Sequence, residues 1–274
     1  MRIGLALGGG GVRGLAHVLA LEVLDELGVR PARIAGTSMG AIIGSLYASG
    51  KNGKDIREGI HQHIIARGEG LKEIFGKRRE LMKWLSAIQL TRRSGGILKA
   101  DGFFAFLFDE LQVESFDELT IPFAAVAADF YRGDAVVLES GDLMSAIQAS
   151  MSIPGVFAPV TRDGRVLVDG GVVNNLPYDI LAEDCDVTIA LDVAPSRDKA
   201  CVASPNIVDA TLGMFDILVD RVTDGMLAER PPTVYCRPEI SGIRVLDFDR
   251  IEDVYLQAQP AMEVFRRELE SMLN

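Results

Sequence analysis

The chain has 274 residues, 48% of them hydrophobic and 24% charged, which is the balance of a folded protein with a substantial core. Its formal net charge of −11 argues against a general nucleic-acid-binding protein, because phosphate binding needs a cationic face. The charge is uneven, since residues 51–100 carry a net charge of +7 and the remainder −18. This basic stretch indicates either a local anionic partner or a solvated helical face.

Cysteine spacing and hydropathy also exclude several classes of protein. Cys185, Cys201 and Cys236 form no CxxC or Cys/His cluster, so neither a zinc site nor a disulfide framework is expected. Three widely spaced cysteines without a disulfide pattern favour the reducing environment of the cytoplasm. The N-terminal apolar run is too short for a signal peptide, and no run of about 18 apolar residues exists, so any membrane contact is expected to be peripheral.

Strand-like and helix-like segments alternate along the chain. Short apolar runs predict strands, and longer amphipathic or small-residue segments predict helices. In chain order the expected elements are strand 2–7, helix 15–27, strand 32–36, helix 39–50, a mostly helical insert at about 51–98, strands 122–130 and 134–140, helix 142–152, strands 165–171, 186–193 and 232–240, and helix 251–273. The alternation predicts one α/β domain over residues 1–274, with a mainly parallel sheet covered by helices on both faces.

The first strand runs into the glycine-rich turn LGGGGVRG, Leu7 to Gly14. Gly9, Gly11 and Gly14 fit the G-x-G-x-x-G dinucleotide fingerprint, but the acid expected at the end of the second strand is missing. Successive glycine N–H groups beside a helix N-terminus suit an oxyanion pocket instead. Three interpretations of Arg13 stay open: it steadies the loop, contacts a phosphate, or lies free on the surface.

The segment GTSMG, Gly36 to Gly40, lies between the second strand and a small-residue helix. In such a strand–turn–helix context, G-x-S-x-G holds the serine on a strained turn with its Oγ exposed. Ser38 is therefore a candidate nucleophile. The alternative is a small-residue turn without any chemistry.

A third glycine-rich turn, VDGGVVNNLP, follows the strand that ends in Asp169. Gly170 and Gly171 leave this carboxylate with little steric cover. The competing interpretation is an ordinary Asp-Gly turn, because Asp-Gly is a common turn sequence.

The positions of the histidines exclude the usual triad. A Ser-His-Asp hydrolase of the α/β-hydrolase kind needs the order serine, acid, histidine, but the chain has only His17, His61 and His63. His17 is expected to be a packed core residue, and the other two lie in the polar insert.

If Ser38 is a nucleophile, its base is therefore expected to be a carboxylate. Asp129, Asp169 and Asp192 all lie near predicted strand ends. Asp169 is favoured because only glycines follow it directly.

Taken together, the three motifs resemble those of the patatin-like phospholipase family. They are GGGVRG (Gly9–Gly14), GTSMG (Gly36–Gly40) and DGG (Asp169–Gly171), in the order that this family has them. The stretch ASMSIPGVFAPV (Ala149–Val160) is also similar, as is DGGVVNNLP in full. The resemblance runs from Arg2 to about Val193.

The resemblance implies a three-layer α/β/α patatin-like fold with a helical insert, and a serine acyl hydrolase that cleaves fatty-acyl esters of phospholipids, lysophospholipids or related lipids. Ser38 would be the nucleophile and Asp169 its proton acceptor in a Ser–Asp dyad, without a metal or another cofactor. The implied oxyanion donors are the N–H groups of Gly9, Gly10 and Gly11. The implied supporting residues are Arg13, Gly14, Gly36, Gly40, Gly170 and Gly171.

The insert and the substrate leave alternatives open. The basic amphipathic segment Lys72–Arg93, with Trp84, suits either an anionic membrane surface or a cap helix packed on the body. A general carboxylesterase or thioesterase of the same fold is a second enzyme interpretation. A catalytically silent lipid-binding protein is a third, and a nucleotide-binding protein is the least favoured. The sequence does not predict an oligomeric state.

Overall fold

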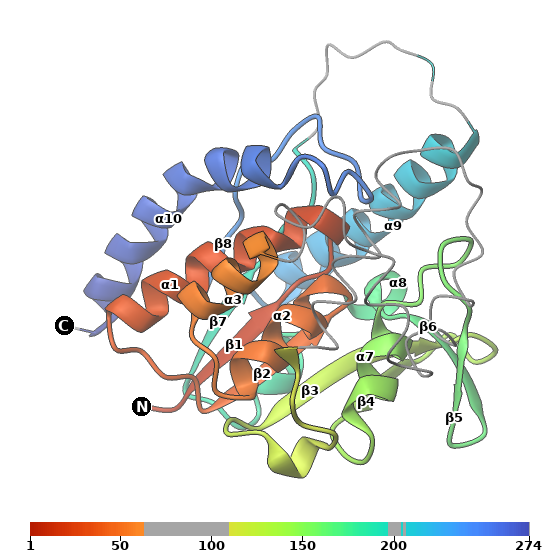
Figure 1. Ribbon diagram of the computed structural model, residues 1–274, viewed down its shortest axis with the longest axis horizontal. Coiled ribbons are helices and arrows are strands. Elements are labelled where there is room, and N and C mark those ends of the chain that lie inside the picture. The colour runs from red at the N-terminus through yellow and green to blue at the C-terminus, as the bar shows by residue number, and fades with distance from the viewer. Residues whose placement is uncertain (63–109, 197–203, 205–206, 274) are drawn as a thin grey trace.

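The computed structural model describes residues 1–62, 110–196, 204 and 207–273, and its elements follow one another in nearly the predicted order (Figure 1). Every strand and helix predicted outside the insert is present, with ends that differ by a few residues. The long helix α9 has no counterpart among the predicted elements. The strands are β1 (Ile3–Leu7), β2 (Arg33–Thr37), β3 (Phe123–Asp129), β4 (Ala135–Leu138), β5 (Val160–Arg162), β6 (Arg165–Asp169), β7 (Val187–Leu191) and β8 (Val234–Cys236). The α-helices are α1 (His17–Glu26), α2 (Met39–Ala48), α3 (Gly53–Ile60), α7 (Leu143–Ser150), α8 (Gly171–Asn174), α9 (Ile207–Glu229) and α10 (Ile251–Leu273), and the 3₁₀ helices are η1 (Gly11–Ala16), η3 (Phe116–Glu118) and η4 (Asp179–Leu181).

The strands of the described residues form one sheet, hydrogen-bonded in the order β5-β6-β3-β2-β1-β7-β8, with β4 also paired to β3. The five strands from β3 to β8 along this order are parallel to one another, whereas β4, β5 and β6 form antiparallel pairs. β1, β3 and β7 are buried along their whole lengths, as expected for parallel strands covered on both faces. The prediction of a mainly parallel sheet is confirmed.

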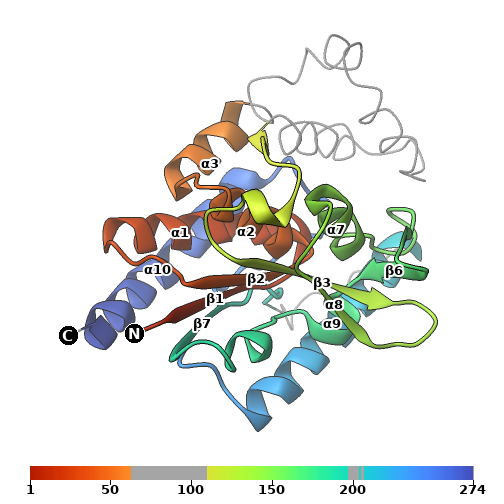
Figure 2. The same ribbon diagram turned by 90° about the horizontal axis from the view of Figure 1, so that it is seen from below.

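Helices cover both faces of this sheet, which gives the predicted three layers. Figure 2 shows α1, α2, α7 and α10 on one side of the sheet and α8 and α9 on the other. The larger core cluster packs sheet residues such as Leu5 and Ile34 against the first group of helices. Alternate positions such as Ala6 and Ala35 pack against the second layer, where Leu176 fills the space.

The carboxyl ends of β2 and β6 meet on one edge of β3. β2 runs parallel to β3 and its last residue, Thr37, pairs with Val126. β6 runs antiparallel, and its last residue, Asp169, pairs with Ala127. β4 pairs with residues 125–128 of β3, a range that includes positions paired with β2 and positions paired with β6. A strand has only two edges, so β4 occupies the edge of β3 that β2 and β6 do not use. β2 and β6 therefore share one edge and approach it from opposite directions, which brings the turns that follow them together.

Most of the insert, residues 63–100, lies outside the described residues, so its predicted helical content stays a prediction apart from α3. The same holds for the predicted single domain over 1–274. His63 and Cys201 also lie outside the described part of the chain.

Close packing at the start of α2 leaves no room for side chains at two glycines of GTSMG. A Cβ at Gly40 would lie 2.0 Å from the carbonyl oxygen of Leu7, and one at Gly36 would lie 2.4 Å from the carbonyl oxygen of Gly40. Glycine therefore allows α2 to begin directly against the backbones of β1 and β2.

Replacing Gly40 by alanine tests this close approach. Gly40→Ala is expected to destabilise the fold by about 3 kcal/mol or more, because the methyl group must displace backbone atoms. The control is Gly225→Ala in α9, where a Cβ would meet nothing within 4 Å. This control is expected to be neutral or to stabilise by up to about 1 kcal/mol. Urea unfolding measures both variants, and equal stabilities would contradict the packing described.

Candidate active site

Ser38 lies on the turn between β2 and α2, with a φ of 55° and a ψ of −119°. A positive φ is costly for a residue that has a side chain, and it is typical of a nucleophile held on a sharp strand-to-helix turn. Ser38 is only 6% exposed. The segment therefore adopts the strained turn that the strand–turn–helix pattern predicts. The predicted exposure of the serine is wrong, because the surrounding elements bury this residue.

Ser150, the last residue of α7, is hydrogen-bonded to the backbone of this turn. The Ser38 N–H donates to Ser150 Oγ at 2.9 Å, and the Ser150 hydroxyl donates to the carbonyl oxygen of Val126 at 2.6 Å. The carbonyl oxygen of Ser150 accepts the N–H of Gly170 at 3.4 Å. One buried residue thus ties together the Ser38 turn, β3 and the turn after β6.

The carboxyl group of Asp169 is buried and only partly hydrogen-bonded. Its Oδ1 accepts the N–H of Gly171 at 2.8 Å, whereas Oδ2 has no hydrogen-bond partner among the described residues. The Asp169 N–H donates to the carbonyl oxygen of Ser152 at 3.0 Å, which fixes the backbone. Gly170 has a φ of −70° and a ψ of −13°, so the chain continues into α8 and does not form a type I′ turn.

Burial raises the pKa of Asp169 to about 6, although the Gly171 N–H and the Ser38 hydroxyl both act to lower it. The Ser38 hydroxyl therefore lies near the carboxyl group, but it does not complete a hydrogen bond to Oδ2 in this structure. Catalytic hydrogen bonds are often long in ligand-free enzymes and shorten in the substrate complex. A carboxyl group with this pKa is mostly ionised at neutral pH and suits a proton acceptor.

The glycine loop after β1 joins the segment that follows β6. The Gly9 N–H donates to the carbonyl oxygen of Asn175, and Asn175 Nδ2 donates to the carbonyl oxygen of Gly9, both at 3.2 Å. The N–H groups of Gly10 and Gly11 have no acceptor among the described residues. Of the three predicted oxyanion donors, Gly9 is thus engaged with Asn175, and Gly10 and Gly11 are available to a ligand.

Arg13 holds the glycine loop in place from a buried position, with 1% of its surface exposed. Its guanidinium donates to the carbonyl oxygens of Val193 (3.3 Å) and Ile243 (3.1 Å). It also forms an ion pair with Asp216 of α9 at 2.9 Å. These contacts match the first of the three interpretations of Arg13, that it steadies the loop. Gly14 brings the same loop against α2, because a Cβ there would lie 2.5 Å from Met39 Cγ.

The described histidines have structural contacts of their own. His17 is fully buried, its Nε2–H donates to the carbonyl oxygen of Gly8 at 2.7 Å, and burial lowers its pKa to about 4. The expectation of a packed core histidine is confirmed. His61 lies on the surface, 3.1 Å from a carboxylate oxygen of Glu252.

The two rival acids are also committed to structural contacts. Asp129 accepts two backbone N–H groups of the β3–β4 turn, both at 3.1 Å. Asp192 accepts the Tyr235 hydroxyl at 2.7 Å and pairs with Arg237 at 3.4 Å. Of the three candidate acids, Asp169 is the one with a fully buried carboxyl oxygen, Oδ2, that has no hydrogen-bond partner among the described residues.

Ser38, Asp169 and the glycine loop line one pocket, and α9 forms much of the opposite wall. That helix contributes apolar side chains, while Ile153 and Val245 extend the apolar lining. The cavity has a volume of ≈ 20 Å³, which holds about one water molecule. A larger ligand therefore reaches Ser38 only if a wall of the pocket moves.

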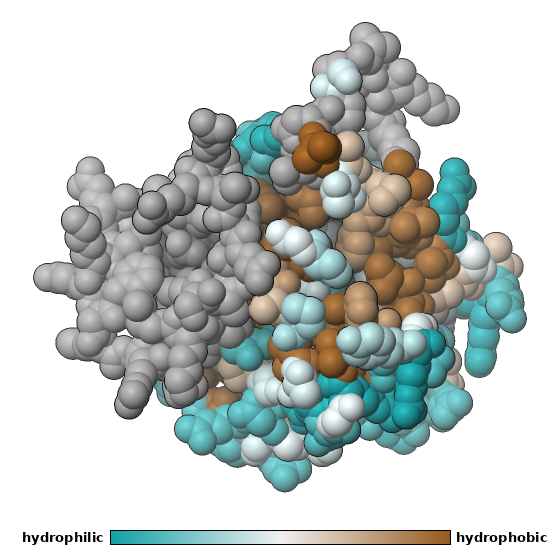
Figure 3. Space-filling model, turned by 90° about the vertical axis from the view of Figure 1, so that its right-hand side faces the viewer, coloured by the Kyte–Doolittle hydropathy of each residue, from teal (hydrophilic) through white to brown (hydrophobic). Residues whose placement is uncertain are grey.

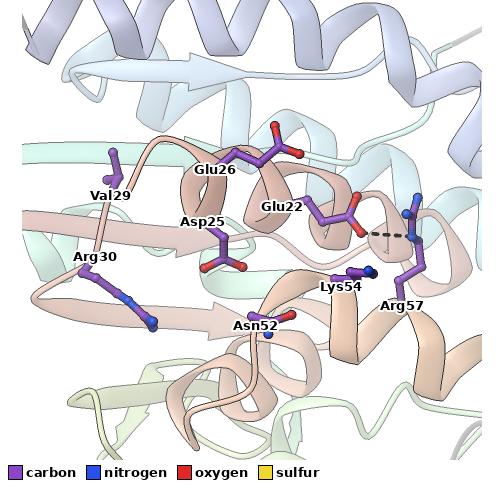
Figure 4. Close-up of a pocket in the computed structure, with 9 residues that line it drawn as sticks. Glu22, Asp25, Glu26, Val29, Arg30, Asn52, Lys54 and Arg57 are labelled. Atoms are coloured by element: carbon purple, nitrogen blue, oxygen red, sulfur yellow. Dashed lines mark ion pairs between the residues drawn. The ribbon is translucent and has the colours of Figure 1, made fainter.

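A larger cleft, of ≈ 520 Å³, lies between α1 and α3 (Figure 4). Residues immediately before β2 line it, so it lies at the opposite end of this strand from Ser38. Several of its charged groups are paired, since Arg57 forms an ion pair with Glu22 at 2.9 Å and Asp25 accepts the Tyr47 hydroxyl at 2.7 Å. These contacts hold α1 against α2 and α3.

Within the described ranges, no group of three or more His, Cys, Asp or Glu side chains is positioned to hold a metal ion. Cys185 and Cys236 are free thiols. None of the helices in the described part of the chain has the length and apolar character needed to cross a membrane.

The raised pKa of Asp169 makes a prediction about stability. Because its folded pKa of about 6 exceeds the ordinary value of 3.8, the folded protein keeps a proton that the unfolded chain loses between these pH values. This group therefore lowers the free energy of unfolding as the pH rises through that window. Asp169→Asn is expected to be more stable than the wild type by about 2–3 kcal/mol at about pH 8, and the gain should shrink towards pH 4. Urea unfolding at both pH values measures the difference, and a gain independent of pH would contradict this description of Asp169.

Comparison with known proteins shows the family to which this chain belongs. A model of the patatin-like phospholipase family matches residues 5–182. The uncharacterized NTE family protein Rv1063c of Mycobacterium tuberculosis is 34% identical over 234 residues, which are 80% of this chain and 59% of that protein. Lysophospholipase NTE1 of Mycosarcoma maydis is 31% identical over 243 residues, which are 88% of this chain and 12% of that protein.

A solved structure shares the fold. The crystal structure of VipD from Legionella pneumophila matches with a TM-score of 0.53 and 14% identity, over 96% of this chain and 67% of that one. The present chain spans less than two thirds of the length of the mycobacterial relative. The family model nevertheless covers most of the chain, including the strands and turns that carry Ser38 and Asp169. The chain belongs to the patatin-like phospholipase family.

Proposed function

We propose that this protein is a serine acyl hydrolase that cleaves fatty-acyl esters of phospholipids or lysophospholipids. The observation that carries the proposal is the buried approach of Ser38, on a strained turn, to Asp169, whose pKa is raised to about 6. Family membership supports the lipid class of substrate, and one relative bears the name lysophospholipase.

In the proposed reaction, Asp169 Oδ2 accepts the hydroxyl proton of Ser38 as Oγ attacks the ester carbonyl carbon. The tetrahedral intermediate collapses, and the departing alcohol takes this proton back from Asp169. The acyl group is then bound to Ser38 as an ester. Water attacks this ester with Asp169 again accepting the proton, and the fatty acid leaves as Ser38 regains its hydroxyl hydrogen.

The Gly10 and Gly11 N–H groups would stabilise the negative oxygen of each tetrahedral intermediate. Both residues line the Ser38 pocket, and neither N–H is used within the described residues. Loss of one such donor typically costs about 3–4 kcal/mol of transition-state stabilisation. Arg13 acts indirectly, because its contacts hold the loop that carries these groups.

A general carboxylesterase or thioesterase remains the second candidate activity, since the same dyad would serve any acyl ester. Turnover of a panel of esters that differ in chain length and headgroup distinguishes it from a lipid hydrolase. A catalytically silent lipid-binding protein would hydrolyse none of them. Membership of the patatin-like family replaces the dinucleotide-binding interpretation of the glycine loop.

Contact of the insert 51–100 with anionic membranes stays a prediction, because residues 63–100 lie outside the described part of the chain. The described basic side chains at its start are already paired. Lys51 lies 2.6 Å from Glu110, and Lys54 lies 3.9 Å from Glu58.

Substitution of the dyad tests the proposed reaction. Ser38→Ala is expected to lower kcat/KM for a long-chain ester by a factor of about 10³ or more, because no other group forms the acyl-enzyme. Asp169→Asn is expected to lower it by a factor of about 10³–10⁴, because an amide cannot accept the proton. Release of fatty acid by the purified variants measures both effects.

The matched control for Asp169→Asn is Asp129→Asn. Asp129 is also a buried carboxylate at the end of a neighbouring strand, and an asparagine there keeps an oxygen for the two turn N–H groups. Its activity should stay within about threefold of the wild type, the range expected for a change away from the reacting atoms. Undiminished turnover in Ser38→Ala, or equal losses in the two Asp variants, would overturn the mechanism.

A further inference from the structure

The N-terminal half of α9 exposes large apolar side chains on its outward face. Ile207 is 86% exposed, Met214 58%, Ile217 44% and Leu218 53%. Their spacing places them on one side of the helix. Figure 3 shows hydrophobic surface gathered over this part of the molecule. Single exposed apolar residues are ordinary in proteins, but a row of them on one helix marks an interaction surface.

The inward face of the same helix lines the Ser38 pocket. Leu212, Phe215 and Val219 are lining residues. Two ion pairs hold this face on the body: Asp216 with Arg13 and Asp220 with Arg237, each at 2.9 Å. Whatever contacts the outward face of α9 therefore lies directly across the helix from the pocket, whose ≈ 20 Å³ must widen to admit a ligand.

Charge divides the outward face of α9 into two halves. The exposed residues Ala210, Thr211, Met214, Ile217 and Leu218 carry no charge. Beyond them, the exposed pair Arg221 and Asp224, 3.5 Å apart, begins a polar half. The outward face of the N-terminal half is therefore apolar and uncharged, as is the face that a membrane-surface helix turns towards lipid.

A second group of exposed side chains lies on the same side of the molecule as the N-terminal end of α9. Phe130 and Tyr131, in the turn between β3 and β4, are 58% and 80% exposed and pack edge to face with ring centroids 5.2 Å apart. Figures 1 and 2 both place this turn and the N-terminal end of α9 on the same side of the molecule. Exposed aromatic side chains are favoured where protein meets the lipid headgroup region.

We propose that these side chains form a lipid-contact surface, which we call the α9 surface: Phe130, Tyr131, Ile207, Met214, Ile217 and Leu218. The surface inserts its apolar side chains among the headgroups of a bilayer that has no net charge, so that an acyl ester passes from the lipid along α9 to Ser38. The identity of the passing molecule rests on the proposed function, but the contact itself does not.

The size of the α9 surface favours lipid over a second copy of this chain. A stable protein–protein interface takes about 800 Å² and about 20–30 residues from each partner. Six side chains fall far short of that, whereas a few apolar side chains inserted between headgroups are enough for peripheral lipid binding.

Vesicle binding tests the proposal without requiring catalysis. Ser38→Ala, which leaves the lipid intact, is sedimented with phosphatidylcholine vesicles in high salt, which screens any contribution from charged segments. Adding Ile217→Ser and Leu218→Ser is expected to lower the partition into vesicles by about tenfold or more, because two apolar side chains no longer leave water. The matched control adds Leu256→Ser and Val264→Ser on α10, which are 68% and 46% exposed, and should bind within about twofold of the parent.

Activity of the same substitutions with Ser38 restored separates the surface from the active site. Neither Ile217 nor Leu218 lines the pocket, so turnover of a soluble short-chain ester should be unchanged, which also shows that the variant is folded. Hydrolysis of lysophospholipid presented in vesicles should fall by the factor measured for binding.

Four outcomes are decisive. Equal vesicle binding by the parent and the α9 variant would overturn the proposal, and so would a parent that does not bind vesicles. A variant that changes only the oligomeric state would assign the surface to a second copy and overturn it too. Reduced vesicle binding in a protein that hydrolyses no ester would support the α9 surface and reject the proposed function.

Discussion

The convergence of β2 and β6 on one edge of β3 is the constraint on which the site depends. An antiparallel strand normally ends at the opposite end of its neighbour from a parallel one. Here β6 pairs only with the part of β3 that lies beyond β2, so both strands end at adjacent positions, Val126 and Ala127. Ser150 then bridges the two turns, because it accepts the Ser38 N–H while its own carbonyl accepts the Gly170 N–H.

Dense packing around that point explains why so many glycines surround it. A Cβ at Gly170 would lie 2.3 Å from the carbonyl oxygen of Val126, and one at Gly11 would lie 2.3 Å from the carbonyl oxygen of Val245. The same density removes water from Asp169 and raises its pKa. Burial thus costs stability at neutral pH, but it makes the Asp169 carboxylate a stronger base than an exposed aspartate.

Much of this arrangement is predictable from sequence, because it depends on local signals. Apolar runs mark the strands, glycines mark the turns, and the lack of a histidine beyond residue 63 points to a carboxylate partner for Ser38. The sequence does not show which of three acids keeps a free oxygen. That depends on distant contacts, such as the Tyr235 hydroxyl that occupies Asp192.

Other parts of the site carry no local signal. Ser150 lies in the family-like stretch Ala149–Val160, but its role depends on β3, which is remote in sequence. The buried state of Arg13 depends on Asp216, 203 positions away. The sequence does not predict α9, because its N-terminal half has apolar residues on two faces. One face lines the pocket and the other faces solvent, so the hydrophobic residues do not show a clear helical period.

The central claim is that Ser38 is a nucleophile whose proton goes to Asp169, and the most direct test is covalent labelling with a fluorophosphonate followed by mass spectrometry at several pH values. The label should appear on Ser38, and its rate should rise with pH through a midpoint near 6, the pKa of Asp169. In Asp169→Asn the labelling should be slow and should lack this midpoint. Labelling of a different serine, or wild-type labelling rates in Asp169→Asn, would contradict the claim.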